Sequence, residues 1–550
     1  MCNKSTDIVF VTPSKKPDMR QESIGTLILA QKAYTNNFEV AIVRFWEASQ
    51  TNYNVFAEEI CDRIFAHNPR IVSFYCRGNE YHILIDLAQR IKKISNITIV
   101  FGGPQAELVA EDTLNLFPCV DYICCGEGEN TIVPLLHMIL HNNKDDAKLT
   151  IPGLVYRNDN GTIRKNKLPD LLPDNYTHND LYYNLVPENV IRNSRSVTID
   201  VGRGCPFSCT FCSTKTFWKQ KYRLRDLTDT IYEIEYVVNH YGNKIFSFSH
   251  DLFTVNKNRV LCFCDKLKES GINIKWTCSA RIDCIDENLI AKMSAAGLVG
   301  IYYGIESGSE RMQKKINKNL NIQRCKEIVK CSIHNKVTVT ASFIYGFPEE
   351  TFDDLNKTLE LIHQLEIIGA DVQLHHLSFE KGSKLYDDYN HKLSFSSREQ
   401  HNEFGVKELS DKISKYPELF STFWNYSSTM RNEMKYLGIF HAIGREYKDT
   451  YVLLISILIN KGLSYVEAFK LVIGLIQDSL IRFEQNKVAI NKSICCFLFE
   501  KIISRLSVQS NLNIRITENE SLQLRSLLLR TTVSCSSDSR SPIPMILDYR

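Results

Sequence analysis

Short apolar runs alternate with helix-like patterns along the first 130 residues of the chain. The apolar runs occupy residues 7–12, 39–46, 70–76, 98–101 and 121–125, and the helical patterns residues 21–34, 53–67, 79–94 and 105–117. Near-continuous apolar strands separated by helices predict a parallel sheet that is covered on both faces. We therefore expect residues 1–135 to form a doubly wound, Rossmann-like α/β domain, with a ligand crevice at the carboxyl ends of its strands.

A second alternating series follows. Its apolar runs occupy residues 197–201, 245–249, 274–278, 300–305, 337–345 and 372–378. Six consecutive βα units predict a partial (β/α)6, TIM-like barrel over residues 196–394, with functional residues at the carboxyl ends of the strands. Residues 136–195 between the two series are rich in turn signals, and we expect them to form a connector.

The remainder of the chain is predicted to be mainly helical. Residues 451–483 carry apolar side chains at helical spacing, and we expect a helical domain over 395–530 that covers the mouth of the barrel. The Ser- and Pro-rich residues 531–550 are expected to be disordered. The fold class is thus α/β with a helical carboxy-terminal region.

Composition narrows the classes of partner. The 66 basic and 63 acidic residues leave a net charge of +3, which offers no uniform field for a nucleic acid. The start of the chain lacks the apolar core of a signal peptide, and the apolar stretch 451–460 is too short to span a bilayer. We therefore expect a cytoplasmic protein with no membrane or nucleic-acid partner. In a reducing compartment, closely spaced members of its 18 cysteines favour metal binding or catalysis over disulfides.

Three cysteines, Cys205, Cys209 and Cys212, lie within eight residues, just after the first strand of the second series. Their thiolates can converge on one soft metal centre if the loop wraps around it. A zinc site or a simple ferredoxin cluster needs a fourth protein ligand, and the next cysteine, Cys262, lies some fifty residues away. The set therefore indicates an iron site that is left open for another ligand. The alternative is a zinc site completed by a distant residue.

The spacing Cys-x3-Cys-x2-Cys, with Phe211 before the last cysteine, resembles the signature of the radical S-adenosylmethionine (SAM) superfamily. The resemblance extends over residues 195–380, where flanking segments occur in the family's order. It implies that the three cysteines hold a [4Fe–4S] cluster, that SAM binds the fourth iron, and that Phe211 lies near the adenine. SAM is then cleaved to methionine and a 5′-deoxyadenosyl radical.

Two of these segments follow the second and third strands. Residues 246–253 resemble the F-x-D-D-x-F segment of cobalamin-type members, which implies that Asp251 approaches the SAM amino group. His250 replaces the first acid of that segment, and a purely structural histidine is the alternative. Ser279 and Arg281 are similar to the segment that touches the SAM carboxylate or ribose, where an arginine can bind bidentately. The alternative for Arg281 is an ion pair with Asp283 or Glu306.

Two further segments follow the fourth and fifth strands. Gly304, Glu306 and Ser307 look like the family's ribose-binding motif, in which a carboxylate accepts both ribose hydroxyl protons and glycine permits close approach. An ordinary turn is the alternative. Gly346 matches the position whose backbone packs on the adenine.

The amino-terminal domain carries a second resemblance. Its strand ends are similar to the cobalamin-binding domain that precedes many radical SAM cores. The residues expected to bind cobalamin are Thr12, Ser73, Gly102, Gly103, Pro104, Gly126 and Glu127. The usual Asp-x-His-x-x-Gly motif is missing, because the loop 12–20 contains no histidine, and His82 is poorly placed. The alternatives are the same fold without a cofactor or with another ligand.

The resemblance implies a cobalamin-dependent radical SAM methyltransferase that acts on an unactivated carbon or phosphorus of a natural product or peptide. Residues 212–218, followed by Arg223 and Arg225, look most like the phosphinate P-methyltransferase group and its peptide- or natural-product-modifying relatives. An electron donor such as flavodoxin or ferredoxin is the expected protein partner. The alternatives are a radical cyclase, epimerase or rearranging enzyme, a non-catalytic iron–sulfur or zinc protein, and a tRNA methylthiotransferase.

Overall fold

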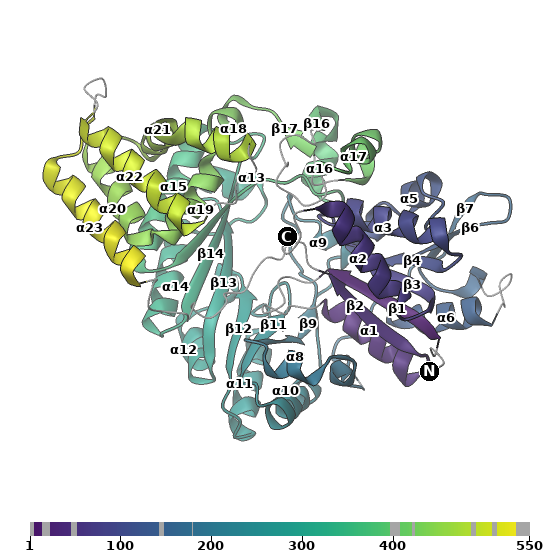
Figure 1. Cartoon of the computed structure of the whole chain (residues 1–550). Coiled ribbons are helices and arrows are strands. Elements are labelled where there is room, and N and C mark those ends of the chain that lie inside the picture. Colours follow the sequence, from purple (N-terminus) through teal and green to yellow (C-terminus); the bar gives the residue numbers. More distant parts are fainter. Residues whose placement is uncertain are drawn as a thin grey trace.

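The computed structural model describes residues 5–13, 23–45, 52–141, 148–178, 180–395, 407–420, 424–485, 491–508 and 514–534. Two separate sheets, each associated with helices, lie side by side, and a group of helices flanks the second sheet (Figure 1). The expected α/β class with a helical carboxy-terminal region is confirmed.

The first sheet has the strand order β2-β1-β3-β4-β5-β6-β7. Its five leading strands are parallel, as near-continuous apolar runs require when helices cover both faces. The strands are β1 (Thr6–Pro13), β2 (Val40–Phe45), β3 (Pro69–Tyr75), β4 (Thr98–Gly102) and β5 (Tyr122–Cys124). The helices are α1 (Ile24–Thr35), α2 (Tyr53–Phe65), α3 (Tyr81–Ile94), α4 (Pro104–Leu108), α5 (Ala110–Leu116) and α6 (Ile132–Leu140). The doubly wound prediction is confirmed.

The segment expected to be a connector instead extends this sheet. Strands β6 (Leu154–Arg157) and β7 (Ile163–Lys165) pair antiparallel with β5 and with each other. The turn signals at 157–161 thus mark a hairpin rather than a linker. Residues 136–195 also contain α8 (Glu188–Arg192). The connector prediction was wrong because a three- or four-residue strand is too short to give a clear alternation of apolar and polar positions.

The second sheet has the order β15-β14-β13-β12-β11-β8, with all neighbours parallel. Its strands are β8 (Val197–Asp200), β11 (Ile245–Ser249), β12 (Lys275–Ala280), β13 (Leu298–Glu306), β14 (Thr338–Tyr345) and β15 (Asp371–His376). The intervening helices are α10 (Leu227–Tyr241), α11 (Lys257–Glu269), α12 (Glu287–Ala295), α13 (Glu310–Lys315), α14 (Ile322–His334) and α15 (Phe352–Ile368). The sheet is an open six-stranded barrel fragment, as predicted, with β8 and β15 at its edges.

Smaller elements surround the carboxyl end of β8. Strands β9 (Gly202–Arg203) and β10 (Arg223–Leu224) form a two-stranded antiparallel ribbon. Helix α9 (Thr214–Phe217) lies between them in sequence. Helix α16 (Lys384–Tyr389) and strand β16 (Leu393–Phe395) follow β15, and β16 pairs with β17 (Trp424–Tyr426).

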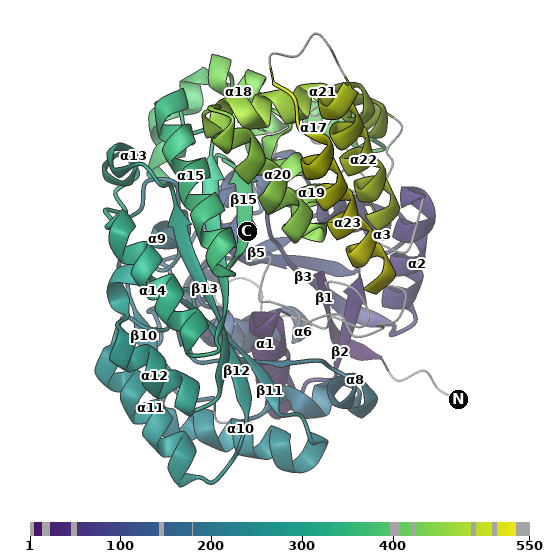
Figure 2. The same cartoon turned by 90° about the vertical axis from the view of Figure 1, so that its left-hand side faces the viewer.

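Of the carboxy-terminal helices, α19 (Leu437–Glu446) packs beside the β15 edge, whereas α18 (Thr429–Glu433) reaches the carboxyl end of β14 through Arg431. The other helices are α17 (Ser410–Lys415), α20 (Lys448–Asn460), α21 (Tyr465–Gln485), α22 (Lys492–Val508) and α23 (Glu518–Ser534). In α19, His441 contacts the carbonyl of Val372 at 3.2 Å, and Arg445 pairs with Asp371 at 2.6 Å. Helices α20 to α23 then stack outward beside α15 (Figure 1, Figure 2). An exposed sheet edge needs such protection, which explains this placement.

The end of the chain also differs from expectation. Residues 531–534, which were expected to be disordered, form the last turn of α23, and 535–550 lie outside the described residues. Among the described residues, no single helix is long and apolar enough to cross a membrane. One pair of consecutive helical segments is long and apolar enough when the two are taken together, but the pair is bent by 120° between them. The segments are Lys448–Asn460 and Tyr465–Arg482.

The carboxyl edges of the two sheets face the same interface. Leu108, in α4 after β4, lies against Gly382 in the loop after β15. Gln105 of the same helix donates to the carbonyl of Leu419 at 2.8 Å. Buried Leu419 and Phe420 pack into the apolar core of the first domain. The structure therefore brings the two predicted ligand edges together.

Candidate active site

The three cysteines lie on a loop that begins directly after β9. Its first residue, Gly204, has φ +83°, and a side chain there would collide with the carbonyl of Lys221. His250 contacts the carbonyl of Gly204 through Nε2 at 3.1 Å, so Nε2 carries the proton and donates it. Burial lowers the pKa of His250 to about 4. The neutral ring therefore anchors the cysteine loop, which favours the structural role for His250.

Further contacts fix the rest of this loop. Asn317 donates to the carbonyl of Ser208 at 3.0 Å, and the amide of Thr210 donates to the carbonyl of Ile316 at 3.0 Å. The three cysteines are unpaired and partly accessible. Their loop is thus held by the core while the sulfur atoms stay free of disulfides.

The thiols require compensation to ionise. Burial raises the pKa of Cys205 to about 12, and the negative charges of Asp251 and the other two cysteines add to this effect. Burial also raises the pKa of Cys209, opposed by the positive charges of Lys318 and Arg281. Coordination to iron supplies the charge that stabilises thiolates in such a setting. Three cysteine sulfurs on one anchored loop, with cations beside it, fit an iron–sulfur cluster. No group of three His, Cys, Asp or Glu side chains among the described residues could hold a single metal ion.

Arg281 connects the end of β12 to the cysteine loop. Its Nη1 lies 3.7 Å from the sulfur of Cys209, and its guanidinium lies 3.9 Å from the ring centre of Phe207. Nε donates to Asp283 at 2.7 Å, so the ion pair considered from the sequence is present. Nη2 donates to the carbonyl of Lys318. Arg281 therefore faces Cys209, while Asp283 and Lys318 orient its guanidinium.

Glu306 ends β13 with a backbone that few non-glycine residues adopt. Its φ is +70°, the strand carries an irregularity between Gly304 and Glu306, and the side chain is only 1% exposed. Lys318 donates to Oε1 at 2.8 Å. A side chain on Gly304 would lie 2.5 Å from this oxygen. Gly304 thus makes room for the buried pair, and strain at Glu306 suits a functional residue.

Phe211 and Gly346 belong to one apolar cluster. Phe211 is buried, 6.0 Å from Phe347 between ring centres in an edge-to-face arrangement. Gly346 has φ +90°. Its amide donates to Oε2 of Glu350 at 2.5 Å, and its carbonyl accepts from Arg431 of α18 at 2.6 Å. The backbone expected to pack on adenine is therefore held from both sides.

The other three residues that are expected to bind SAM differ in their surroundings. Asp251 is exposed, and its charge acts on Cys205. Ser279 is half-buried on β12, and its carbonyl accepts from the amide of Phe253 at 3.0 Å. The hydroxyl of Ser307 contacts that of Thr358 at 3.1 Å and so points into the protein. Their contacts with SAM stay predictions.

The expected cobalamin residues mostly occupy the carboxyl edge of the first sheet. Gly102 ends β4, Gly103 has φ +102°, and Pro104 is the first residue of α4. A side chain at Gly103 would lie 2.9 Å from the carbonyl of Cys76, whereas one at Gly102 would meet no atom closer than 3.8 Å. A side chain at Gly102 would thus make only ordinary van der Waals contact with Cys124. The role of Gly102 in binding cobalamin stays a prediction.

Two expected cobalamin residues come from the first and third strands. Buried Thr12 lies next to the end of β1, where its hydroxyl donates to the carbonyl of Pro13 at 3.4 Å. Ser73 pairs with Val100 and lies two positions inside β3, not at its end. Residues 14–20 of the histidine-free loop lie outside the described residues. His82 is buried within α3.

Gly126 and Glu127 make contacts that the sequence did not indicate. A side chain at Gly126 would lie 2.9 Å from Pro169, so close packing explains this glycine without a ligand. Both carboxylate oxygens of Glu127 bind Arg223, at 2.9 and 2.8 Å. The Glu127 carboxylate thus joins the two domains, and direct binding of cobalamin by it stays a prediction.

Comparison with known proteins agrees with this geometry. The family model of the radical SAM superfamily matches residues 199–362, and that of the B12 binding domain matches residues 16–136. An uncharacterized methyltransferase of Pyrococcus horikoshii is 31% identical over 314 residues, which cover 56% of this chain and 67% of the relative. The chain therefore belongs to the radical SAM superfamily, to the group that carries a B12-binding domain.

Other relatives have different names. The anaerobic magnesium-protoporphyrin IX monomethyl ester cyclase of Cereibacter sphaeroides is 26% identical, covering 57% of this chain and 52% of the relative. The cytidylyl-2-hydroxyethylphosphonate methyltransferase of Streptomyces wedmorensis is 26% identical, and the match covers 54% of this chain and 61% of that relative. The chain thus spans about half to two thirds of the length of these relatives.

Solved structures share the architecture. The cobalamin-dependent SAM radical enzyme OxsB, with aqua-cobalamin bound, superposes with a TM-score of 0.63 at 14% identity, covering 97% of this chain and 85% of OxsB. The predicted cofactors, a [4Fe–4S] cluster, SAM and cobalamin, are confirmed by the two families.

Two residues of this site were missed by sequence reasoning. Lys318 lies in a charged stretch, and Arg431 lies in a helical region without a motif. Neither type nor spacing distinguishes them from surface cations, and only their burial, 7% and 4% exposed, reveals them. A buried cation needs an anion or carbonyl partner, which here belongs to the ends of β13 and β14.

Proposed function

We propose that this radical SAM enzyme is a cobalamin-dependent methyltransferase for an unactivated carbon or phosphorus of a natural product or peptide. The observation that supports it is the common edge at which the two domains meet. The cysteine loop and Glu306 lie at the carboxyl end of the second sheet, and Gly102 lies at that of the first. Residues on both sides of the interface, Leu108 and Gly382, are in contact.

In such an enzyme the bound cofactors supply a 5′-deoxyadenosyl radical and a transferable methyl group. The protein's own residues bind and orient them. Arg281 and Lys318 place positive charge beside Cys209 and thereby favour its thiolate. Glu306 offers a buried carboxylate for the ribose hydroxyls, and Phe211 with Phe347 forms an apolar, water-excluding wall near Gly346.

A second candidate is radical chemistry without methyl transfer, such as ring formation. The similarity to the magnesium-protoporphyrin cyclase, which is named for ring formation, is the reason to test it. That relative is 26% identical over 57% of this chain, whereas the methyltransferase of Pyrococcus horikoshii is 31% identical over 56%, so the comparisons favour methyl transfer. The two candidates differ in products, since methyl transfer consumes SAM in two ways.

We further propose a small-molecule or peptide substrate, a cytoplasmic location and reduction by a flavodoxin or ferredoxin. The near balance of 66 basic and 63 acidic residues agrees with a partner that is neither nucleic acid nor membrane. The partly accessible cysteine loop provides a route for electrons from a docked donor.

The test is anaerobic reconstitution followed by analysis of the products from SAM. We expect about four irons per chain, one cobalamin, and both S-adenosylhomocysteine and 5′-deoxyadenosine under reducing conditions. Formation of 5′-deoxyadenosine alone, in the presence of bound cobalamin and candidate substrates, would contradict methyl transfer and favour the second candidate. Cys209→Ala should lose the cluster and both products. Cys262→Ala, which removes an exposed cysteine on α11, is the matched control and should lose neither.

A further inference from the structure

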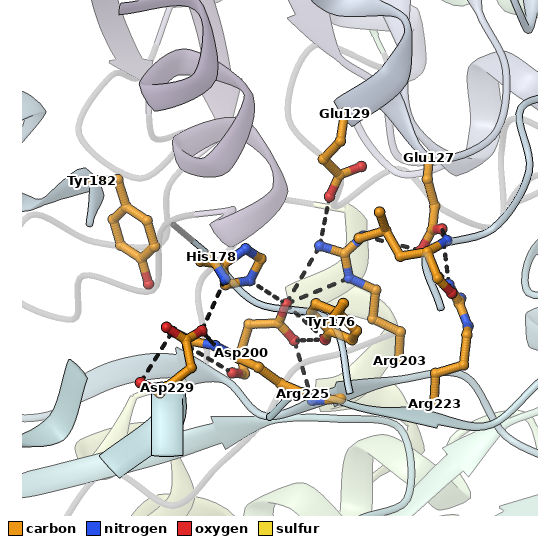
Figure 3. A network of polar contacts seen from close by, with 12 residues as sticks. Glu127, Glu129, Tyr176, His178, Tyr182, Asp200, Arg203, Arg223, Arg225 and Asp229 are labelled. Atoms are coloured by element: carbon orange, nitrogen blue, oxygen red, sulfur yellow. Dashed lines mark hydrogen bonds and ion pairs between the residues drawn. The ribbon is translucent and has the colours of Figure 1, made fainter. Parts of the chain in front are cut away.

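A buried network of charged side chains joins the two α/β domains (Figure 3). Arg203 of β9 donates through Nη1 to Glu127 at 3.0 Å, and its Nη2 lies 2.6 Å from Glu129. Both glutamates follow β5 of the first domain. The same guanidinium lies 3.4 Å from Asp200, at the end of β8 in the second domain. One largely buried side chain therefore binds carboxylates of both domains.

Arg223 reinforces this contact from the neighbouring strand. Arg223 and Arg203 are directly opposed in the β9–β10 ribbon, so their side chains project on one face. Nη1 of Arg223 donates to both oxygens of Glu127 and to the carbonyl of Leu172 at 3.0 Å. Oε2 of Glu127 also accepts from the amide of Leu172 at 2.5 Å. The Glu127 carboxylate is thus enclosed by the ribbon and by the segment that leads into the second domain.

The far side of Arg203 is also fixed. Asp200 accepts from the hydroxyl of Tyr176 at 3.0 Å and contacts Nε2 of His178 at 2.9 Å. Burial alone would raise the pKa of Asp200, but the charge of Arg203 and the contact with His178 hold it well below its usual range. The ring centre of Tyr176 lies 5.1 Å from the Arg203 guanidinium. Arg203 therefore has little freedom to change partners.

The network lies close to both predicted cofactor sites along the chain. Arg203 precedes Cys205 by two residues, a span of at most ~7 Å. Glu127 directly follows Gly126. Buried ion pairs add little net stability compared with apolar packing, whereas they strongly favour one geometry. Such a contact is suited to setting a position rather than to holding the domains together.

We propose that Glu127, Arg203 and Arg223 form an ionic clamp that sets the position of the cobalamin-binding edge relative to the cluster loop. The three residues are positioning residues, because Arg203 and Glu127 anchor the chain segments beside them and Arg223 holds Glu127. The proposal rests on the proposed function in requiring that both cofactors are bound. It goes beyond that function in assigning the residues that fix their separation.

The test uses the full-length holoenzyme and two mild variants, Arg203→Gln and Arg223→Gln. Iron and cobalamin contents are measured first. The magnetic interaction between cob(II)alamin and the reduced cluster is then recorded by electron paramagnetic resonance, because it depends steeply on their distance. We expect both cofactors to stay bound in both variants. The magnetic interaction between them should become weaker or more broadly distributed. The rate of 5′-deoxyadenosine formation should stay within about twofold of wild type. The rate of S-adenosylhomocysteine formation should fall by about tenfold or more, since small displacements of reacting groups are costly.

Arg324→Gln is the matched control, because it removes an arginine–glutamate pair with Glu287 that lies wholly within the second domain. Its magnetic interaction should equal that of wild type. An unchanged interaction in both clamp variants, with both cofactors present, would overturn the clamp. Hydrogen exchange of residues 126–131 and 203–212 provides a second measurement that needs no cobalamin. If the wild-type protein binds no cobalamin, the proposed function fails. The clamp can then still be tested by hydrogen exchange, and exchange rates that match wild type in residues 126–131 and 203–212 of both variants would overturn it.

Discussion

The ammonium nitrogen of Lys318 lies 2.8 Å from Oε1 of Glu306. The two residues are twelve positions apart in the sequence, one before and one after α13, and both are almost completely buried. The same ammonium lies 5.9 Å from the ring centre of Phe211. Lys318 therefore links the expected ribose-binding carboxylate of Glu306 to Phe211, the aromatic residue that precedes Cys212.

Replacing Lys318 should weaken SAM binding. In Lys318→Met the apolar stem is retained, but the carboxylate of Glu306 loses the ammonium group that orients its Oε1. We expect the dissociation constant of SAM to rise by about tenfold, measured by titration of the reconstituted protein. Lys314→Met, at an exposed position of α13, should leave it unchanged. Equal affinity in the Lys318 variant would contradict the assigned role.

Glu350 should make stability depend on pH. Burial raises its pKa to about 8, opposed by the amides of Gly346 and Phe347. The folded protein therefore keeps a proton that the unfolded chain releases above a pKa of 4.5. The stabilisation is complete below that lower pKa and is lost as the pH rises through about 8. Glu350→Gln stays neutral, so its melting temperature should rise relative to that of wild type between about pH 5 and 8. A difference that stays constant across this range would be the contrary result.

Arg431 should support the Gly346 backbone from the helical region. Besides Gly346, its guanidinium contacts Nδ1 of His376 at 3.3 Å and Asn425 at 2.7 Å. Because the guanidinium is always a donor, Nδ1 of His376 accepts this hydrogen bond and carries no proton. Arg431→Met leaves several acceptors unpaired, and we expect a loss of about 2–3 kcal/mol in the free energy of unfolding in urea. SAM affinity should also fall.

Two other substitutions serve as controls for the effect of Arg431 on SAM affinity and stability. Arg431→Lys keeps the charge but lacks the fork of donors, so its effects should lie between those of wild type and the Met variant. Arg445→Met removes the pair with Asp371 at the opposite end of β15 and should leave SAM affinity intact. If both Met variants weaken SAM binding equally, the effect reflects general destabilisation of the helical region.

Glycine substitutions should separate backbone strain from collision. Gly103 and Gly161 have positive φ values of 102° and 79°. A side chain at Gly103 would meet the carbonyl of Cys76, whereas one at Gly161 would meet nothing within 4 Å. We expect Gly161→Ala to cost about 1 kcal/mol and Gly103→Ala at least about 2 kcal/mol in urea unfolding. Similar costs at the two positions would contradict the close approach at Gly103.

Local patterns in the sequence predicted most of the elements within a few residues. β11 was expected over residues 245–249 and is found at Ile245–Ser249. The helix expected over 105–117 is divided at Val109 into α4 and α5. The hairpin β6–β7 was missed, because its strands are short and their pairing with β5 depends on a turn outside the strands themselves. The position of the helical region was predicted only in part, since α18 reaches the carboxyl end of β14 whereas α19 packs beside β15. Amphipathic helices show an apolar face without showing what it packs against.

The sequence by itself determined the two α/β units, the three cysteines after β8 and the glycines at strand ends, because each of these depends on neighbours a few positions away. Only the tertiary structure decided that Lys318 holds Glu306, that Arg431 of α18 reaches Gly346 and that Glu127 binds Arg203 and Arg223 of the other domain. These cations resemble surface residues in the sequence. Their roles depend on burial and on partners up to 96 positions away, which are set by the packing of whole elements.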